Sequence, residues 1–156
     1  ERTGMELTAS TYVDASPETV WRVLTDFDEY PEWNPFLRVT GRANEGAHLS
    51  VELRPPGRRA TTFRPTVTGV EFERELRWLG HLLVAGLYDG EHRFRADPEG
   101  DGTRFTQSER FEGLLVGVVN RWLGVGSSVE AGFVAMNDAL RARAEAMAGA
   151  AEEVAG

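Results

Sequence analysis

The stretch V-D-A-S-P-E-T-V-W-R-V-L-T-D-F-D-E-Y-P-E-W-N-P-F-L runs from Val13 to Leu37 and decides the fold. It joins the end of an alternating strand to a helix that starts at a proline, and then to an aromatic turn interrupted by Pro31 and Pro35. Ser16 is placed to cap the helix, and Pro17 takes its first position, where a missing N–H costs nothing. The aromatic turn is too apolar to remain in solvent, so the rest of the chain must supply a surface that receives it.

Two short helices are predicted here. The first has an apolar stripe, formed by Val20, Trp21, Val23 and Leu24. Residues 26–35 predict a second short helical turn followed by a loop, because a proline disfavours helix in the residue before it. The preceding run, Met5–Ala15, alternates between apolar and polar positions as a half-buried strand requires.

Six more alternating runs follow, each ended by glycine, proline or acidic residues. They are Leu37–Ala43, His48–Arg54, Thr61–Val70, Glu73–Leu79, Tyr88–Asp97 and Thr103–Glu112. Consecutive short strands with tight turns predict an antiparallel meander, and the clearest hairpin is the D-P-E-G-D-G turn at Asp97–Gly102.

Beyond Gly113 the hydrophobic period becomes helical. Ser127 and Glu130 have the spacing of a capping box, and apolar residues follow at helical intervals: Val129, Phe133, Met136, Leu140, Ala144 and Met147. This pattern predicts a long C-terminal helix, preceded by a shorter helical piece at Leu114–Leu123.

The order of elements predicts an α+β fold in which a seven-stranded antiparallel sheet curls around the C-terminal helix. Two short helices lie between the first and second strands. A sheet of this kind can bury one strongly apolar helix only by wrapping it, and the interior of such a half-barrel need not be filled. With 156 residues and no linker or low-complexity segment, the chain is expected to form a single domain over residues 1–156.

Composition narrows the chemistry. The chain has no cysteine, and all 17 basic residues are arginine, which removes thiolate nucleophiles, sulfur-ligated metals and lysine Schiff bases. The three histidines, His48, His81 and His92, have no metal-ligand spacing, so no metal and no cofactor are expected.

Net charge and hydropathy indicate the partners. A formal charge of −8 opposes binding to nucleic acid. No apolar run approaches the ~20 residues of a membrane-spanning helix. The first residues, E-R-T-G-M-E, have no signal-peptide pattern, so a cytoplasmic location is expected.

Three motifs, A-S-P-E-T-V-W, D-E-Y-P-E-W-N-P-F and G-F-V-A-M-N-D-A-L-R-A-R-A-E, together with the order of elements, resemble the START-like, helix-grip superfamily. Within it the chain resembles the polyketide cyclase/dehydrase and lipid-transport proteins over roughly Met5–Ala146. The resemblance implies a deep cavity between the sheet and the long helix. It does not choose among the superfamily's carriers, hormone receptors, ring-forming enzymes and resistance proteins.

A His–Glu pair is the best candidate for chemistry. If the last hairpin turns at residues 99–101, alternation puts His92 opposite Glu109 on the concave face, as it puts Phe94 opposite Gln107. The carboxylate would then hold the imidazole in one tautomer while the other ring nitrogen faces the ligand as a proton shuttle. The alternative is a buried polar pair whose members only satisfy each other.

Other side chains are expected to contact the ligand. Four aromatic residues, Trp33, Phe36, Trp78 and Tyr88, are placed around the mouth of the cavity, which suits a planar or lipid-like molecule. The alternative is that Trp33 and Trp78 are core residues packed on each other. The remaining candidates are Asn34, Leu53, Phe63, Phe94, Gln107, Phe111, Phe133 and Asn137. Asn34 also fits a turn residue, and Asn137 also fits a hydrogen bond on the helix surface.

The apolar segment Leu114–Val125 fits three roles: a gate over the cavity, a surface that touches membrane or a partner protein, or core. Three functions follow in order of preference. The first is binding or transport of a hydrophobic small molecule. The second is an aromatase/cyclase-type enzyme that dehydrates or closes a polyketide ring. The third is a membrane- or partner-docking assembly factor. Whether the protein is an enzyme is left open, and the oligomeric state is unknown.

By resemblance, enzymes of the second kind use arginine inside the pocket to polarise carbonyls. Alternation instead points five arginines outward, and this pattern argues against the enzyme hypothesis. They are Arg54, Arg64, Arg77, Arg93 and Arg95.

Overall fold

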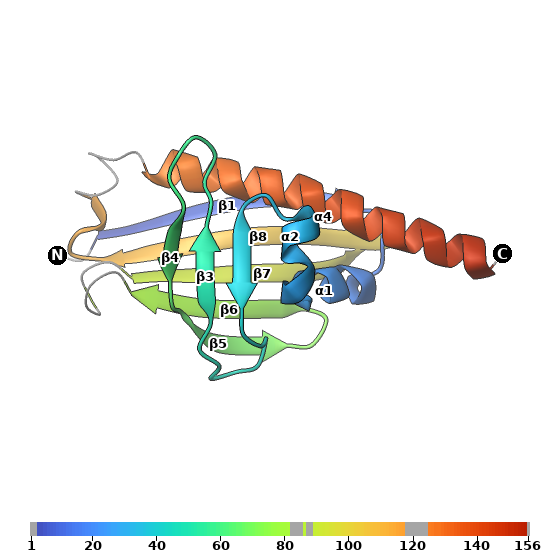
Figure 1. Cartoon of the computed structure of the whole chain (residues 1–156), viewed down its shortest axis with the longest axis horizontal. Coiled ribbons are helices and arrows are strands. Elements are labelled where there is room, and N and C mark those ends of the chain that lie inside the picture. The colour runs from blue at the N-terminus through green and yellow to red at the C-terminus, as the bar shows by residue number, and fades with distance from the viewer. Residues whose placement is uncertain (1–2, 82–85, 87–88, 118–124, 156) are drawn as a thin grey trace.

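The computed structural model describes residues 3–81, 86, 89–117 and 125–155. Within them, antiparallel strands form a five-stranded sheet in the order β1-β8-β7-β6-β5 and a three-stranded sheet in the order β2-β3-β4 (Figure 1). The larger sheet contains β1 (Thr3–Val13), β5 (Thr66–Glu71), β6 (Glu75–His81), β7 (Asp89–Glu99) and β8 (Gly102–Gly113). The smaller sheet contains β2 (Leu37–Thr40), β3 (Ser50–Leu53) and β4 (Thr61–Phe63). Its strands run crosswise to those of the larger sheet in Figure 1.

Short helices connect β1 to β2 as the sequence predicts. They are α1 (Pro17–Thr25), the 3₁₀ turn η1 (Phe27–Glu29) and α2 (Tyr30–Trp33). The Ser16 side chain accepts a hydrogen bond from the Thr19 N–H at 3.2 Å, which confirms the predicted N-cap. The apolar stripe of α1 is buried.

The long helix α4 spans Val125–Ala155 and packs on β1, α1 and β8. The predicted stripe is confirmed, because Val129, Phe133, Met136, Leu140 and Ala144 are all buried. The predicted capping box is wrong: Val125 and Gly126 are already helical, so Ser127 lies inside the helix. In the described part of the chain, no helix has both the length and the apolar character to cross a membrane.

The fold class is confirmed, with a difference in strand count. The run predicted as one strand, Thr61–Val70, is two strands in different sheets, and the break falls at Arg64 and Pro65. Pro65 has no N–H to donate to a sheet ladder, which favours a break in the strand at this position. The described residues therefore contain eight strands in two sheets instead of seven in one.

Backbone hydrogen bonds join the two sheets. The Leu49 N–H donates to the Pro65 carbonyl at 2.9 Å, and the Val67 N–H donates to the Ala47 carbonyl at 2.9 Å. The hydrophobic core includes side chains from both sheets, α1 and α4. Phe36, just before β2, packs edge-on against Phe133 of α4, with ring centroids 5.9 Å apart. The smaller sheet is thereby held over one end of the interface between α4 and the larger sheet.

Candidate functional site

The inner faces of β7 and β8 hold the polar residues that the sequence singled out. His92 is opposite Glu109 and Phe94 is opposite Gln107, which confirms the predicted register. His92 is 2% exposed, and its ring stacks on Phe94 with centroids 4.2 Å apart. Trp78 of β6 lies against both rings. Packing therefore holds the imidazole in one orientation.

Three side chains form a hydrogen-bonded chain. The Nε2 atom of His92 is 3.0 Å from Gln107 Oε1, and Gln107 Nε2 donates to Asn137 Oδ1 on α4 at 2.8 Å. The other ring nitrogen, Nδ1, is 3.5 Å from Glu109 Oε2. The prediction that one ring nitrogen would face the ligand is therefore wrong, because Gln107, which the sequence placed among the ligand contacts, holds Nε2.

Burial acts in opposite directions on the two titratable groups. Desolvation, partly offset by the hydrogen bond to Gln107, lowers the pKa of His92 from 6.5 to about 4. Desolvation, together with the negative charge of Glu91, raises the pKa of Glu109 from 4.5 to about 8. At neutral pH the pair is consequently an uncharged imidazole beside a protonated carboxyl group, and not an ion pair.

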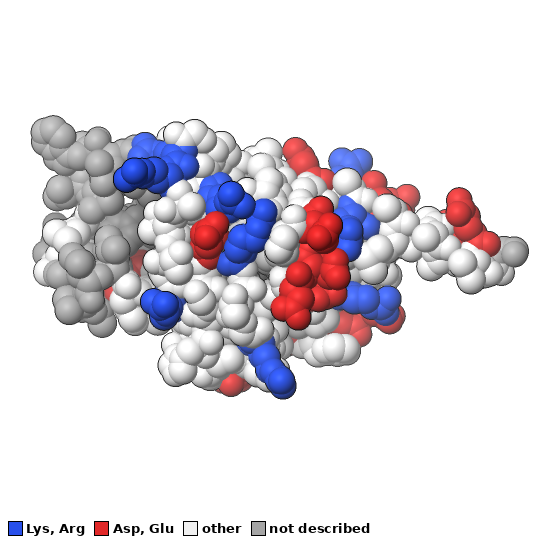
Figure 2. All heavy atoms as spheres, in the orientation of Figure 1, with Lys and Arg blue, Asp and Glu red and all other residues white. Residues whose placement is uncertain are grey.

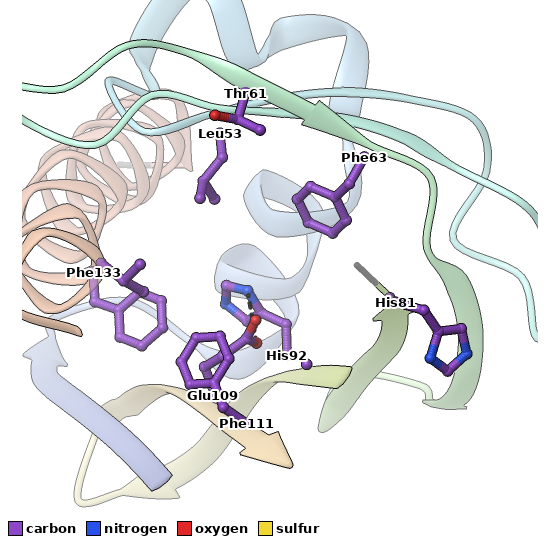
Figure 3. Close-up of a pocket in the computed structure, with 11 residues that line it drawn as sticks. Leu53, Thr61, Phe63, His81, His92, Glu109, Phe111 and Phe133 are labelled. Atoms are coloured by element: carbon purple, nitrogen blue, oxygen red, sulfur yellow. Dashed lines mark ion pairs between the residues drawn. The ribbon is translucent and has the colours of Figure 1, made fainter. Parts of the chain in front are cut away.

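A cavity of about 160 Å³ lies above this pair (Figure 3). In Figure 3, Leu53, Thr61 and Phe63 of the smaller sheet bound it on one side, and His92, Glu109 and Phe111 of the larger sheet bound it on the opposite side. Phe133 of α4 closes it laterally, and the lining is completed by Gly80, His81, Gly90 and Val129. Most of the lining is apolar, so the cavity suits an apolar guest.

Two of these glycines help to keep the space open. A Cβ atom on Gly90 would come within 3.0 Å of Glu109 Oε1, and one on Gly80 would come within 3.0 Å of the Phe63 ring. Any side chain at Gly90 would crowd the carboxyl group from the side of the cavity. The close contacts that a Cβ atom would make therefore explain why glycine suits these two strand positions.

Six predicted site residues line the cavity: Leu53, Phe63, His92, Glu109, Phe111 and Phe133. Five others are buried but are not part of its lining: Asn34, Phe36, Trp78, Phe94 and Gln107. Asn137 is likewise buried, where it accepts the hydrogen bond from Gln107. Asn34 is a turn residue, since its Oδ1 accepts from the N–H groups of Phe36 and Leu37 at 2.9 and 3.0 Å.

The predicted aromatic mouth is wrong for Trp33 and Phe36. Trp33 lies in another hollow of about 280 Å³, which Val23, Glu29, Arg143 and Met147 also line. Phe36 is 1% exposed and belongs to the core. Trp33 is the last residue of the four-residue helix α2, and its side chain faces α1 and α4. A helix this short has too few residues for hydrophobic periodicity to predict which way a side chain faces. Tyr88 lies outside the described residues.

Figure 2 shows acidic side chains gathered over η1 and α2, next to this second hollow. Asp26, Asp28, Glu29 and Glu32 are exposed there.

The sequence did not single out Thr61, Gly80, His81, Gly90 or Val129 as site residues. Val129 was available from the helical stripe, and Gly90 has the same strand parity as His92. Thr61 and His81 lie at strand ends on the exposed rim, where parity says little.

The segment 114–125 is only partly described: Leu114 is exposed and Val116 is buried. Its predicted role as gate, core or docking surface stays a prediction.

The arginines of β6 and β7 lie on the outer face of the sheet, as predicted. Glu75 is 5% exposed and forms ion pairs with all three of them. Its Oε2 atom lies 3.0 Å from Arg77 Nε, and its Oε1 atom lies 3.5 Å from Arg93 Nε and 2.8 Å from Arg95 Nη1. No arginine is present among the described residues that line the cavity. The described lining therefore offers no guanidinium to polarise a carbonyl.

A curved antiparallel sheet around a long helix, with an apolar hollow between them, defines a protein of the helix-grip class. The chain belongs to the family described as polyketide cyclase / dehydrase and lipid transport, whose model matches residues 5–145. A comparison of the sequence with curated proteins gave no match.

Solved structures share this fold at low sequence identity. A Staphylococcus aureus protein of unknown function is 12% identical with a TM-score of 0.70, over 94% of this chain and 97% of that one. Norcoclaurine synthase from Thalictrum flavum, in complex with dopamine and hydroxybenzaldehyde, is 16% identical with a TM-score of 0.67, over 90% and 86%. The di-domain ARO/CYC protein BexL from the BE-7585A biosynthetic pathway is 17% identical with a TM-score of 0.64, over 93% and 50%.

Proposed function

We propose that this protein binds a small, largely apolar molecule in the cavity between the two sheets and α4. The observation that carries the proposal is the cavity itself, about 160 Å³ of space lined mainly by Leu53, Phe63, Phe111, Val129 and Phe133. An apolar cavity of roughly 150 Å³ in another protein is large enough to hold benzene. A guest of this kind gains the free energy of leaving water without displacing any core side chain.

A matched pair of variants tests the proposal. Thr61 lines the cavity and Thr62 does not, although both are exposed residues of β4. In Thr61→Trp the indole is expected to occupy the cavity, so the affinity for toluene, followed by ¹⁵N NMR titration, should fall by roughly tenfold or more. Thr62→Trp should bind toluene as the unmodified protein does. Equal binding by the two variants would place the guest elsewhere, and absence of binding by the unmodified protein would remove the proposal.

The second candidate is an enzyme of the cyclase or dehydrase type, which the family description and the ARO/CYC structure make reasonable. The specific observation in its favour is Glu109, a carboxyl group that borders the cavity and whose pKa is raised to about 8. Such a group keeps its proton near neutral pH and can donate it as a general acid when Oε1, the oxygen beside the cavity-lining Gly90, carries the proton.

The assay for this candidate is dehydration of a small aromatic β-hydroxyketone, followed by the absorbance of the enone. Glu109→Gln should lower the rate by roughly a hundredfold, because the amide cannot give up a proton. Glu112→Gln, an exposed position of the same strand, is the control. An unchanged rate in Glu109→Gln would rule out Glu109 as a general acid, and binding would then be the only proposed function that remains.

A further inference from the structure

The hydrogen bond at α4 determines which atom donates in each hydrogen bond of the chain. Gln107 Nε2 donates to Asn137 Oδ1, which leaves Gln107 Oε1 toward His92. An amide oxygen can only accept, so the Nε2 atom of His92 must carry the hydrogen. A neutral imidazole has one N–H, and Nδ1 therefore has a lone pair that needs a donor.

Glu109 is placed to be that donor. Its Oε2 atom lies 3.5 Å from Nδ1, is buried, and makes no hydrogen bond to any described residue in the present geometry, so it is free to turn a hydrogen toward Nδ1. Because the carboxyl group is protonated below its pKa of about 8, Oε2 can hold the hydrogen and point it at Nδ1. The other oxygen, Oε1, is then a carbonyl oxygen and an acceptor.

Oε1 is the atom that a ligand can reach. It lies beside Gly90, where a Cβ atom would come within 3.0 Å of it, and both residues line the cavity. The other polar side chains of the lining are Thr61 and His81 at the exposed rim, and the buried His92. The His81 ring points away from the cavity in Figure 3, with its Nδ1 2.7 Å from Asp89 Oδ1.

We propose that the ligand is an uncharged, mostly apolar molecule with a hydroxyl group, such as a phenol, which donates a hydrogen bond to Glu109 Oε1. This inference rests on the proposed function, because it assigns the chemistry of the guest in the same cavity. A ketone or ether offers no donor and leaves Oε1 unsatisfied. A carboxylate brings an uncompensated charge into an apolar space that contains no arginine among its described lining residues.

Three ligands with the same ring test the inference at pH 6.5: phenol, anisole and benzoate. Their affinities are measured by NMR titration of the unmodified protein. Phenol should bind roughly tenfold more tightly than anisole, from which methylation has removed the donor, and benzoate should bind most weakly.

Two variants of Glu109 supply the controls. In Glu109→Gln the amide nitrogen can donate to His92 and the amide oxygen can still accept, so the preference for phenol should remain. In Glu109→Leu the acceptor is gone, and phenol and anisole should bind with similar affinity.

The outcomes separate the two proposals. Equal affinities for all three ligands, or a preference for anisole, overturn the hydroxyl assignment while the binding function stands. A phenol preference that survives in Glu109→Leu also overturns the assignment. Absence of binding by all three ligands overturns both proposals.

Discussion

His92 and Glu109 show how one apolar environment acts on a base and an acid in opposite ways. Burial disfavours the charged form of each group, so the pKa of His92 falls and that of Glu109 rises. Neither group is charged at neutral pH as a result. Each residue therefore lies in the apolar interior in its uncharged form, and the hydrogen bond to Gln107 fixes the histidine tautomer.

These shifts predict a particular dependence of stability on pH. The folded protein holds the Glu109 proton more tightly than the unfolded chain, so the contribution of Glu109 to stability is lost as pH rises from about 4.5 to about 8. His92, whose pKa is lowered, loses its contribution as pH falls from 6.5 to about 4. Between pH 6.5 and 8 the effect of Glu109 is thus separated from that of His92.

The test is urea unfolding of the unmodified protein and of Glu109→Gln at pH 6.5 and pH 8. We expect the free energy of unfolding of the unmodified protein to fall by about 1–2 kcal/mol relative to the variant over this interval. An identical pH response of the two proteins would show that Glu109 keeps an ordinary pKa in the fold.

Residue by residue, strand parity predicted the inner face of β7 and β8 because alternation with period two has a single phase per strand. It therefore placed His92, Phe94, Gln107 and Glu109 correctly. It could not predict which partner each polar group would choose. Gln107 hydrogen-bonds to His92 and Asn137 because α4, which packs mainly on β1, also contacts β8, and local periodicity does not contain this tertiary placement.

At the scale of elements, the contact between α4 and the segment before β2 depends on a glycine. A Cβ atom on Gly132 would lie 2.2 Å from the Phe36 ring. Phe36 is 1% exposed, and its ring packs edge-on against Phe133. The helix can approach Phe36 this closely only because position 132 has no side chain, which gives this glycine a packing role in spite of its poor helix propensity.

Gly132→Ala should consequently destabilise the protein by about 1–3 kcal/mol, since overpacking outweighs the roughly 1 kcal/mol gain in helix propensity. Gly149→Ala in the same helix has nothing within 4 Å of the added Cβ and should be neutral or stabilising by up to about 1 kcal/mol. Thermal unfolding of both variants provides the comparison. If Gly132→Ala is as stable as Gly149→Ala, the contact with Phe36 is looser than described.

Some boundaries of helices and strands could be predicted from local sequence, and others could not. The cap at Ser16 was predictable because serine followed by proline places the helix start within one residue. The change of sheet at Arg64–Pro65 was not, because the alternation continues through it and only the lack of an N–H on Pro65 marks the break. Ser127 matched a capping box, yet Val125 and Gly126 are already helical, so the spacing of Ser127 and Glu130 alone does not fix the start of the helix.

For the whole molecule, the interface between α4 and the larger sheet is filled along the middle of the helix and hollow near its start. Met136, Leu140 and Ala144 are fully buried in the core, whereas Val129 and Phe133 border the cavity. The far end of α4 extends beyond the sheet in Figure 1, and Val154 is 88% exposed. The sequence predicted the wrapped helix, but the extent of the hollow depends on how the smaller sheet crosses the larger one.

The most direct test of this account is a crystal structure of the protein under xenon pressure. Xenon binds in apolar cavities without any requirement for shape or hydrogen bonds, so it reports the hollow independently of ligand identity. We predict anomalous density for xenon between Leu53, Phe111 and Phe133. Side chains that fill this space, with no xenon bound there, would contradict the central claim that the fold forms a site for an apolar guest.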